Sequence, residues 1–230
     1  MSPRDPAGDG RPPFIFDAHC DTASVLADKP WGFRRSPAHI DLRKARAGGL
    51  QAQVFAVWVD PLFAPHRALK RGLEVLRALE DKVFAPGLAA KVTTVAAMDE
   101  AVAAGKLAGW VFLEGGHIIE DSLEVLDAFR SLGVAGMTLT HGKNVSWADS
   151  STDSPRVRGL TALGRRIVAR MERTGMAIDV AHVSDATARA VLRAVSAPVM
   201  ASHSNARRLC DVPRNLSDDL IRAIARRGGF

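Results

Sequence analysis

The chain has 230 residues, which is enough for one sizeable domain with a real hydrophobic core. Hydrophobic residues make up 47% and charged residues 24%, and no apolar run approaches the roughly 20 residues that cross a bilayer. The formal net charge is +6, but the excess arginines lie in helix-like segments with amphipathic spacing. The sequence has no tyrosine and only four tryptophans, so no aromatic platform for nucleic acid is expected. Composition therefore argues against both a membrane span and a nucleic-acid-binding module.

The first 13 residues, MSPRDPAGDGRPP, are polar and rich in proline and glycine, and they lack the apolar core of a secretory signal. We therefore expect a disordered leader over residues 1–13 and a single domain over residues 14–230. The two cysteines, Cys20 and Cys210, are too few for a disulfide framework, and they form no C-x-x-C pair that would suggest a thiolate zinc site. A cytoplasmic location is the expectation.

Short apolar runs alternate with helical patterns along the rest of the chain. The expected strands are residues 14–17, 52–58, 110–113, 135–140, 176–180 and 198–201, and the expected helices lie near residues 66–83, 97–105, 121–132, 160–174, 184–195 and 217–227. This alternation predicts a parallel sheet covered by helices. Two architectures fit it, an open doubly wound sheet and a (β/α)8 barrel. The glycine motifs of dinucleotide-binding and phosphate-binding sheets do not occur.

Metal-capable side chains stand at or directly after the ends of five expected strands. They are His19, Glu114, His141, His182 and His203. In a barrel, the carboxyl ends of the strands form one rim, on which the active site is built. Imidazole and carboxylate groups that converge there suit zinc or a similar divalent ion. A single strand-end histidine is more often a solvent-facing residue, so it is the joint pattern that favours a metal site.

The first of these clusters lies in FIFDAHCDTAS, residues 14–24. Alternation along a strand puts Asp17, His19 and Asp21 on one face and Cys20 on the other. Cys20 is therefore expected to pack behind the strand, with a cysteine nucleophile as the alternative. Asp17 is expected beside the site rather than in it.

Three further histidines and one arginine give no such joint pattern. His39 and His66 lie in loop or helix-start contexts and are expected on the surface. His117, in EGGH, leaves both a structural role and a role in the site open. By its residues alone, Arg214 in PRN is an ordinary surface arginine.

Four blocks carry a resemblance to a known family: DAHCDT, LEGGHIIEDSLEVLDAFRSLGVAGMTLTHGKNVSWADSSTD, IDVAHVSDATARAVL and SHSNARRLCDVPRNLSDDLIRAIARRGG. From about residue 14 to its end, the chain resembles the renal-type (membrane) dipeptidases, the M19 metallopeptidases. That family is a (β/α)8 barrel with two zinc ions. The resemblance implies a zinc-dependent dipeptidase in which a hydroxide held between the ions attacks the peptide bond of a dipeptide.

The resemblance also implies a set of metal ligands. His19 and Asp21 are expected to bind one zinc ion, and His182 and His203 are expected to bind the other. Glu114 is expected to bridge the two ions. All five residues come from the strand-end positions or the segment beside them.

Two further residues match family positions that contact the substrate. His141, in MTLTH, matches the histidine that touches the scissile carbonyl oxygen, and we take His141 and Glu114 as the catalytic residues. Arg214 matches the arginine that binds the carboxylate end of the substrate, a role that a planar guanidinium suits.

The family barrel continues for two strands beyond the position that matches Phe230. We therefore expect about six of the eight strand–helix units in this chain. Three functions stay open: the dipeptidase, a related amidohydrolase that acts on a lactam, lactone or phosphoester, and a metal-binding remnant without catalysis. Members of the family are often dimers, so a homodimer is an open alternative.

Overall fold

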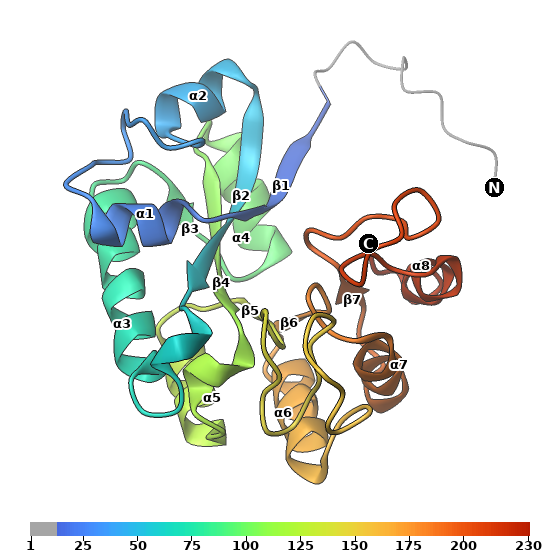
Figure 1. Ribbon diagram of the computed structural model, residues 1–230. Coiled ribbons are helices and arrows are strands. Elements are labelled where there is room, and N and C mark those ends of the chain that lie inside the picture. Colours follow the sequence, from blue (N-terminus) through green and yellow to red (C-terminus); the bar gives the residue numbers. More distant parts are fainter. Residues whose placement is uncertain (1–12) are drawn as a thin grey trace.

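The structure is a computed structural model that describes residues 13–230 (Figure 1). The predicted leader over residues 1–13 lies, except for Pro13, outside the described residues. Within residues 13–230, no helix combines the length and the apolar character that crossing a membrane requires.

Parallel strands form one sheet at the centre of the fold. They are β1 (Ile15–Cys20), β2 (Leu50–Trp58), β3 (Ala90–Lys91), β4 (Ala108–Glu114), β5 (Gly136–Thr138), β6 (Ala177–Asp179) and β7 (Val199–Met200). Their order is β1-β2-β4-β5-β6-β7, and β3 pairs with the start of β4. The six predicted strands are all present. β3 is additional, and its two residues are too short to give a periodic signal.

Helices cover the outside of this sheet (Figure 1). They are α1 (Thr22–Asp28), α2 (Leu42–Ala47), α3 (Ala68–Leu79), α4 (Val95–Ala103), α5 (Leu123–Ser131), α6 (Ala162–Arg173), α7 (Asp185–Ala194) and α8 (Asp218–Ala225), with shorter 3₁₀ segments at Pro61–Phe63 and Gly116–Ile119 and a π-helical segment at Glu80–Phe84. Side chains cap two of the expected helix starts, because Thr161 accepts from the Gly164 N–H and Ser184 accepts from the Thr187 N–H. Ser217, which the sequence NLSDDL places at the start of α8, makes no side-chain cap hydrogen bond. The short helices α1 and α2 were not predicted.

The sheet curves so that its inner face is also filled by side chains. Val54, Phe112, Ala135 and Met200 form a buried cluster there, and Phe16 packs against it. The two ends of the strand order approach one another, because the Ala201 N–H, directly after β7, donates to the Phe230 carbonyl, and the Phe230 ring contacts the Phe16 ring at 6.0 Å between centroids. A flat doubly wound sheet would keep these ends apart. The fold is therefore a partial (β/α) barrel, with all strand carboxyl ends at one rim.

Candidate metal centre

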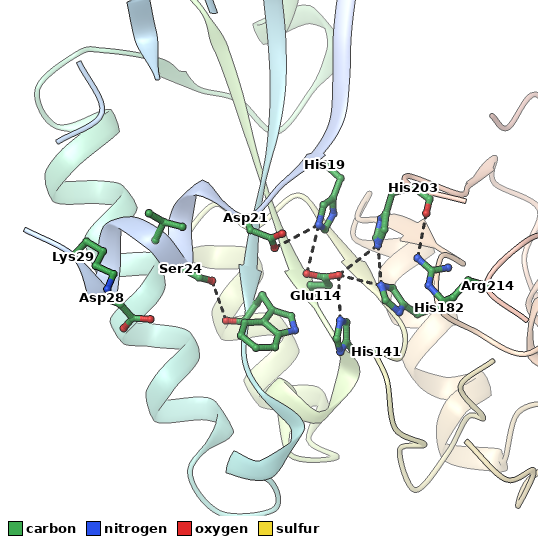
Figure 2. A pocket seen from close by; sticks show the side chains of 12 residues that line it. His19, Asp21, Ser24, Asp28, Lys29, Glu114, His141, His182, His203 and Arg214 are labelled. Carbon is green, nitrogen blue, oxygen red and sulfur yellow. Dashed lines mark hydrogen bonds and ion pairs between the residues drawn. The ribbon is translucent and has the colours of Figure 1, made fainter. Parts of the chain in front are cut away.

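Glu114, the last residue of β4, lies at the centre of the candidate site (Figure 2). Its carboxylate is buried, and imidazole Nε2 atoms surround it. From Oε1, the distance is 3.2 Å to His182, 3.5 Å to His203 and 3.8 Å to His141, and from Oε2 it is 3.6 Å to His19. The five strand-end residues of the sequence therefore lie together, each brought by a different strand.

These histidines set the electrostatics of the carboxylate. Burial alone would raise the pKa of Glu114, but its close contacts with His182 and His203 and the charges of His19 and His141 hold this pKa well below its usual range. Burial also lowers the pKa of His182 and lowers that of His141 to about 4. The ionised carboxylate therefore faces neutral imidazoles at His141 and His182, which is the protonation pattern that a metal ion requires of its ligands.

The end of β1 brings His19 to the cluster, and Asp21 follows at the N-cap of α1. The His19 Nε2 lies 3.6 Å from Asp21 Oδ1. Burial alone would lower the pKa of His19, but the Asp21 and Glu114 carboxylates raise it instead. The strand register is irregular between Asp17 and Cys20, and the Asp17 Oδ1 accepts from the His19 backbone N–H at 3.1 Å. Asp17 thus contacts the backbone of His19 rather than the cluster.

Cys20 packs against the main hydrophobic core, as expected from strand alternation. Burial raises the pKa of its thiol to about 12. The thiol is therefore protonated at neutral pH and unsuited to act as a nucleophile.

His182 adopts an unusual backbone conformation, with φ at 65° in the left-handed region. The Ser151 N–H donates to the His182 carbonyl at 2.7 Å, and the Ser150 Oγ lies 3.3 Å from the same oxygen. The Ser150 hydroxyl also donates to the His141 carbonyl at 2.5 Å. The loop that follows β5 therefore supports the backbone of both histidines.

The remaining histidines lie apart from the cluster. His39 and His66 are exposed, as expected. His117, whose role the sequence left open, places its Nε2 2.9 Å from the Val59 carbonyl oxygen, and burial lowers its pKa. His117 therefore has a backbone partner of its own on β2's side of the fold.

A cavity of about 600 Å³ opens beside the cluster, and Arg214 lines it (Figure 2). The Arg214 guanidinium donates to the His203 carbonyl at 3.1 Å and lies 3.4 Å from the Ser204 hydroxyl. Burial lowers the pKa of Arg214. The guanidinium forms no ion pair with any residue between 13 and 230, so a half-buried positive charge faces the cavity without a carboxylate partner.

Two overlapping groups of side chains could hold metal ions. One is His19, Glu114 and His203, and the other is Glu114, His141 and His182; within each group the candidate ligand atoms lie within 4.8 Å of one another. Imidazole nitrogens and carboxylate oxygens are the donors that zinc takes in proteins. Glu114 belongs to both groups, as a bridging ligand must. The grouping differs from the one implied by the resemblance, which places His182 with His203.

Residues 12–230 match the family model of the membrane dipeptidases, peptidase family M19. The chain belongs to this family. Dipeptidase 3 of Macaca fascicularis is 34% identical over an alignment of 228 residues, and the match covers 94% of this chain but 46% of that protein. The M19 chain thus spans about half the length of this curated relative.

Solved structures agree with the fold. A metallo peptidase from Rhodobacter sphaeroides, solved with a phosphinate mimic of the dipeptide L-Ala-D-Ala, superposes with a TM-score of 0.83 at 24% identity, over 94% of this chain and 72% of that one. A structure described as dipeptidase AC, of the same M19 family, gives a TM-score of 0.83 at 26% identity, over 93% of this chain and 69% of that one. The predicted barrel class and the resemblance to M19 are confirmed.

Several residues that line the cavity of the M19 chain were not anticipated. They are Ser24, Val25, Asp28 and Lys29 on and after α1, and Trp58 at the end of β2. The Trp58 ring lies 5.7 Å from the His141 ring. Trp58 could have been predicted to line the cavity, because it ends a predicted strand at the same rim. The residues of α1 could not, because the helix itself was not predicted.

Proposed function

We propose that this M19 chain carries the metal-binding and substrate-binding side chains of a dipeptidase, an enzyme that hydrolyses the peptide bond of dipeptides. One observation carries the proposal: four imidazoles converge on the buried carboxylate of Glu114, in the same cavity as the guanidinium of Arg214, which forms no ion pair within residues 13–230. The first feature suits divalent ions, and the second suits a substrate with a free carboxylate.

Metal ions would be held by the five residues that the resemblance implies. These are His19, Asp21, Glu114, His182 and His203. When bound, such ions supply Lewis-acid polarisation of the scissile carbonyl and an activated water at neutral pH. Zinc as the metal, two ions per chain and a bridging hydroxide stay predictions.

His141 would stabilise the carbonyl oxygen as negative charge develops on it. Its Nε2 lies 3.8 Å from the Glu114 carboxylate, whereas its Nδ1 is buried without a hydrogen-bond partner among the described residues, which favours a hydrogen on Nε2 over one on Nδ1. Because its pKa is about 4, the ring is neutral at pH 7 and keeps that single N–H. Removal of one such donor from an oxyanion site typically costs about 2.7–4 kcal/mol of transition-state stabilisation.

Arg214 would bind the C-terminal carboxylate of the substrate. A planar guanidinium binds a carboxylate through two parallel hydrogen bonds, and the partial burial of Arg214 strengthens that interaction. Since Arg214 and the histidine cluster line one cavity, the carboxylate and the scissile bond must lie close together in the substrate. A dipeptide meets this condition. A homodimer and a cytoplasmic location stay predictions.

The test uses the full chain, freed of metal by a chelator and then loaded with zinc. We expect metal analysis to give two equivalents and the loaded chain to hydrolyse dipeptides, with both properties lost in His182→Ala. His39→Ala, at an exposed histidine outside the cluster, is the matched control and should retain both. Fewer than two equivalents in the folded chain, or full activity in His182→Ala, would contradict the proposal. A panel of lactam, lactone and phosphoester substrates separates the dipeptidase from a related amidohydrolase.

A further inference from the structure

Asp179, at the end of β6, is a wholly buried carboxylate that contacts no substrate or metal in the proposed function. Its two oxygens accept four hydrogen bonds. Oδ1 accepts from the backbone N–H groups of Ala181 at 2.9 Å and Ser202 at 3.0 Å. Oδ2 accepts from the Thr138 hydroxyl at 2.6 Å and from the Ser202 hydroxyl at 2.6 Å. The acceptor capacity of the carboxylate is therefore filled from three neighbouring strand ends.

The Ser202 hydroxyl connects this carboxylate to the metal cluster. Its Oγ lies 2.7 Å from the Nδ1 of His203. A hydroxyl has one hydrogen, and here that hydrogen points to Asp179, because a carboxylate only accepts. Towards His203 the Ser202 oxygen can then only accept, so the His203 Nδ1 must carry a hydrogen.

The hydrogen on Nδ1 determines the state of the second ring nitrogen of His203, Nε2. With its hydrogen on Nδ1, a neutral His203 presents a bare lone pair at Nε2. That lone pair faces Glu114 Oε1 at 3.5 Å and His182 Nε2 at 2.8 Å. An imidazole binds a metal through such a lone pair, and the partner of its second nitrogen decides which nitrogen is free.

We infer that Asp179 is a positioning residue: through the Ser202 hydroxyl it holds His203 in the tautomer whose Nε2 lone pair faces Glu114. The tautomer itself is a property of the metal-free chain. Only its effect on metal affinity depends on the proposed function.

The variant Asp179→Asn tests this directly, because the structure fixes how the amide must sit. The two backbone N–H groups at Oδ1 require an oxygen there, so the amide nitrogen takes the place of Oδ2 and faces two hydroxyls. Ser202 then accepts from the amide and donates its hydrogen to the His203 Nδ1. The hydrogen of His203 moves to Nε2, and the lone pair no longer faces the cluster.

Thr138→Val is the matched control. It removes a hydroxyl that donates to the same Asp179 oxygen over the same distance as Ser202, from a side chain that is 1% exposed, but it leaves the link from Ser202 to His203 intact. A purely structural role of Asp179 predicts similar effects from both hydroxyls. A positioning role predicts that only changes on the Ser202 side alter His203.

The readout is ¹⁵N NMR of the metal-free chain labelled in histidine, with the His203 signals assigned by their loss in His203→Gln. We expect a protonated Nδ1 and an unprotonated Nε2 in the unmodified chain and in Thr138→Val, and the reverse in Asp179→Asn. Ser202→Ala, which removes the link, should give a mixture of the two tautomers and serves if Asp179→Asn does not fold. We also expect the zinc dissociation constant, from chelator competition, to rise about 10–100-fold in Asp179→Asn and to stay near the unmodified value in Thr138→Val.

An unprotonated Nδ1 in the unmodified chain, or an unchanged His203 tautomer in both Asp179→Asn and Ser202→Ala, would overturn the inference. A reversed tautomer with unchanged zinc affinity would overturn the positioning role toward the metal. If the unmodified chain binds no zinc, the proposed function fails, whereas the NMR result on the metal-free chain still decides the tautomer.

Discussion

The Nε2 atoms of His182 and His203 lie 2.8 Å apart, and both are within 3.5 Å of the same oxygen of Glu114. Two ring nitrogens at this distance share one hydrogen between them in the metal-free chain. A metal ligand needs the lone pair at Nε2, so ion binding at this pair would break this hydrogen bond and place the shared hydrogen on another ring nitrogen. The hydrogen bond between His182 and His203 therefore opposes metal binding. The negative charge of Glu114 favours metal binding and offsets this effect.

Glu114→Gln is expected to abolish tight metal binding. The amide keeps the size of the side chain but removes the charge that all four imidazoles face, and the loss should exceed the about 10–100-fold in affinity typical of residues that support a ligand. Zinc titration with a competing chelator measures it. Glu124→Gln, an exposed glutamate in the first turn of α5, is the control and should bind zinc as before. Equal affinities in the two variants would remove Glu114 from the metal site.

Arg214→Lys is expected to raise KM for dipeptides by about 10–100-fold with little change in kcat, since a charge-assisted hydrogen-bond pair is worth about 1.5–3 kcal/mol. Lysine keeps the charge but loses the planar fork. A dipeptide amide, which lacks the terminal carboxylate, should be nearly insensitive to this change. Arg208→Lys, at a side chain that is 80% exposed, is the control. A similar rise in KM for the dipeptide and for the dipeptide amide would show that Arg214 does not recognise the carboxylate.

The contribution of His141 to the stability of the metal-free chain should fall as the pH is lowered from neutral. His141 takes up a proton near its ordinary pKa of 6.5 in the unfolded chain but only near about 4 in the fold. Between these values the unfolded chain binds more protons, so the free energy of unfolding decreases as pH falls through this window. From about pH 7 to about pH 5 the contribution of this one group is on the order of 1–2 kcal/mol.

Urea unfolding of the metal-free chain at the two pH values checks this prediction against His141→Gln, which has no titrating ring. The variant should lose less stability than the unmodified chain over the same interval. Parallel losses in the two proteins would show that His141 is not held neutral by the fold.

Gly116→Ala is expected to destabilise the fold by about 1–3 kcal/mol, as overpacking of a filled interior does. A methyl group there would lie 2.4 Å from the Trp147 Cζ2 and 2.6 Å from the Leu139 carbonyl oxygen, both of which are held by their own packing. Gly32→Ala is the control, because a Cβ on Gly32 meets nothing within 4 Å. The midpoint temperatures of thermal unfolding of the two variants are compared with that of the unmodified chain. Equal midpoints would mean that the segment after Glu114 can move aside.

The rim of the barrel could be predicted from sequence because each buried parallel strand is a mainly apolar run, and the end of that run marks its carboxyl end. His141, His182 and His203 were predicted as metal-capable residues that stand one to two positions after such runs. Helix α1 was not predicted because it has only seven residues, which give little periodic signal. Its N-cap residue, Asp21, makes no side-chain cap hydrogen bond, and the helix is held by packing against α3 and β2. The residues of α1 that line the cavity could therefore not be predicted from the sequence.

Asp179 shows a different limit. It lies in the predicted strand and reads as one more polar residue near a strand end, yet its partners Thr138 and Ser202 are 41 and 23 positions away in the chain. They meet it because β5 and β7 flank β6 in register, with Thr138 opposite Asp179 and Asp179 opposite Met200. Pairing of this kind depends on strand order, which a single sequence does not determine.

The left-handed backbone at His182 restricts which chemistry this position can carry. Apart from glycine, the residues most often found in that conformation are asparagine, aspartate and histidine. Of these, histidine and aspartate are common metal ligands, whereas glutamate and cysteine would have to adopt an unfavourable backbone. Replacement of the proposed metal ligand at residue 182 is thus confined to a choice between the nitrogen of histidine and the short carboxylate of aspartate. A redesign of the metal preference would have to begin with the loop that holds this turn, at Ser150 and Ser151, before it changes the ligand itself.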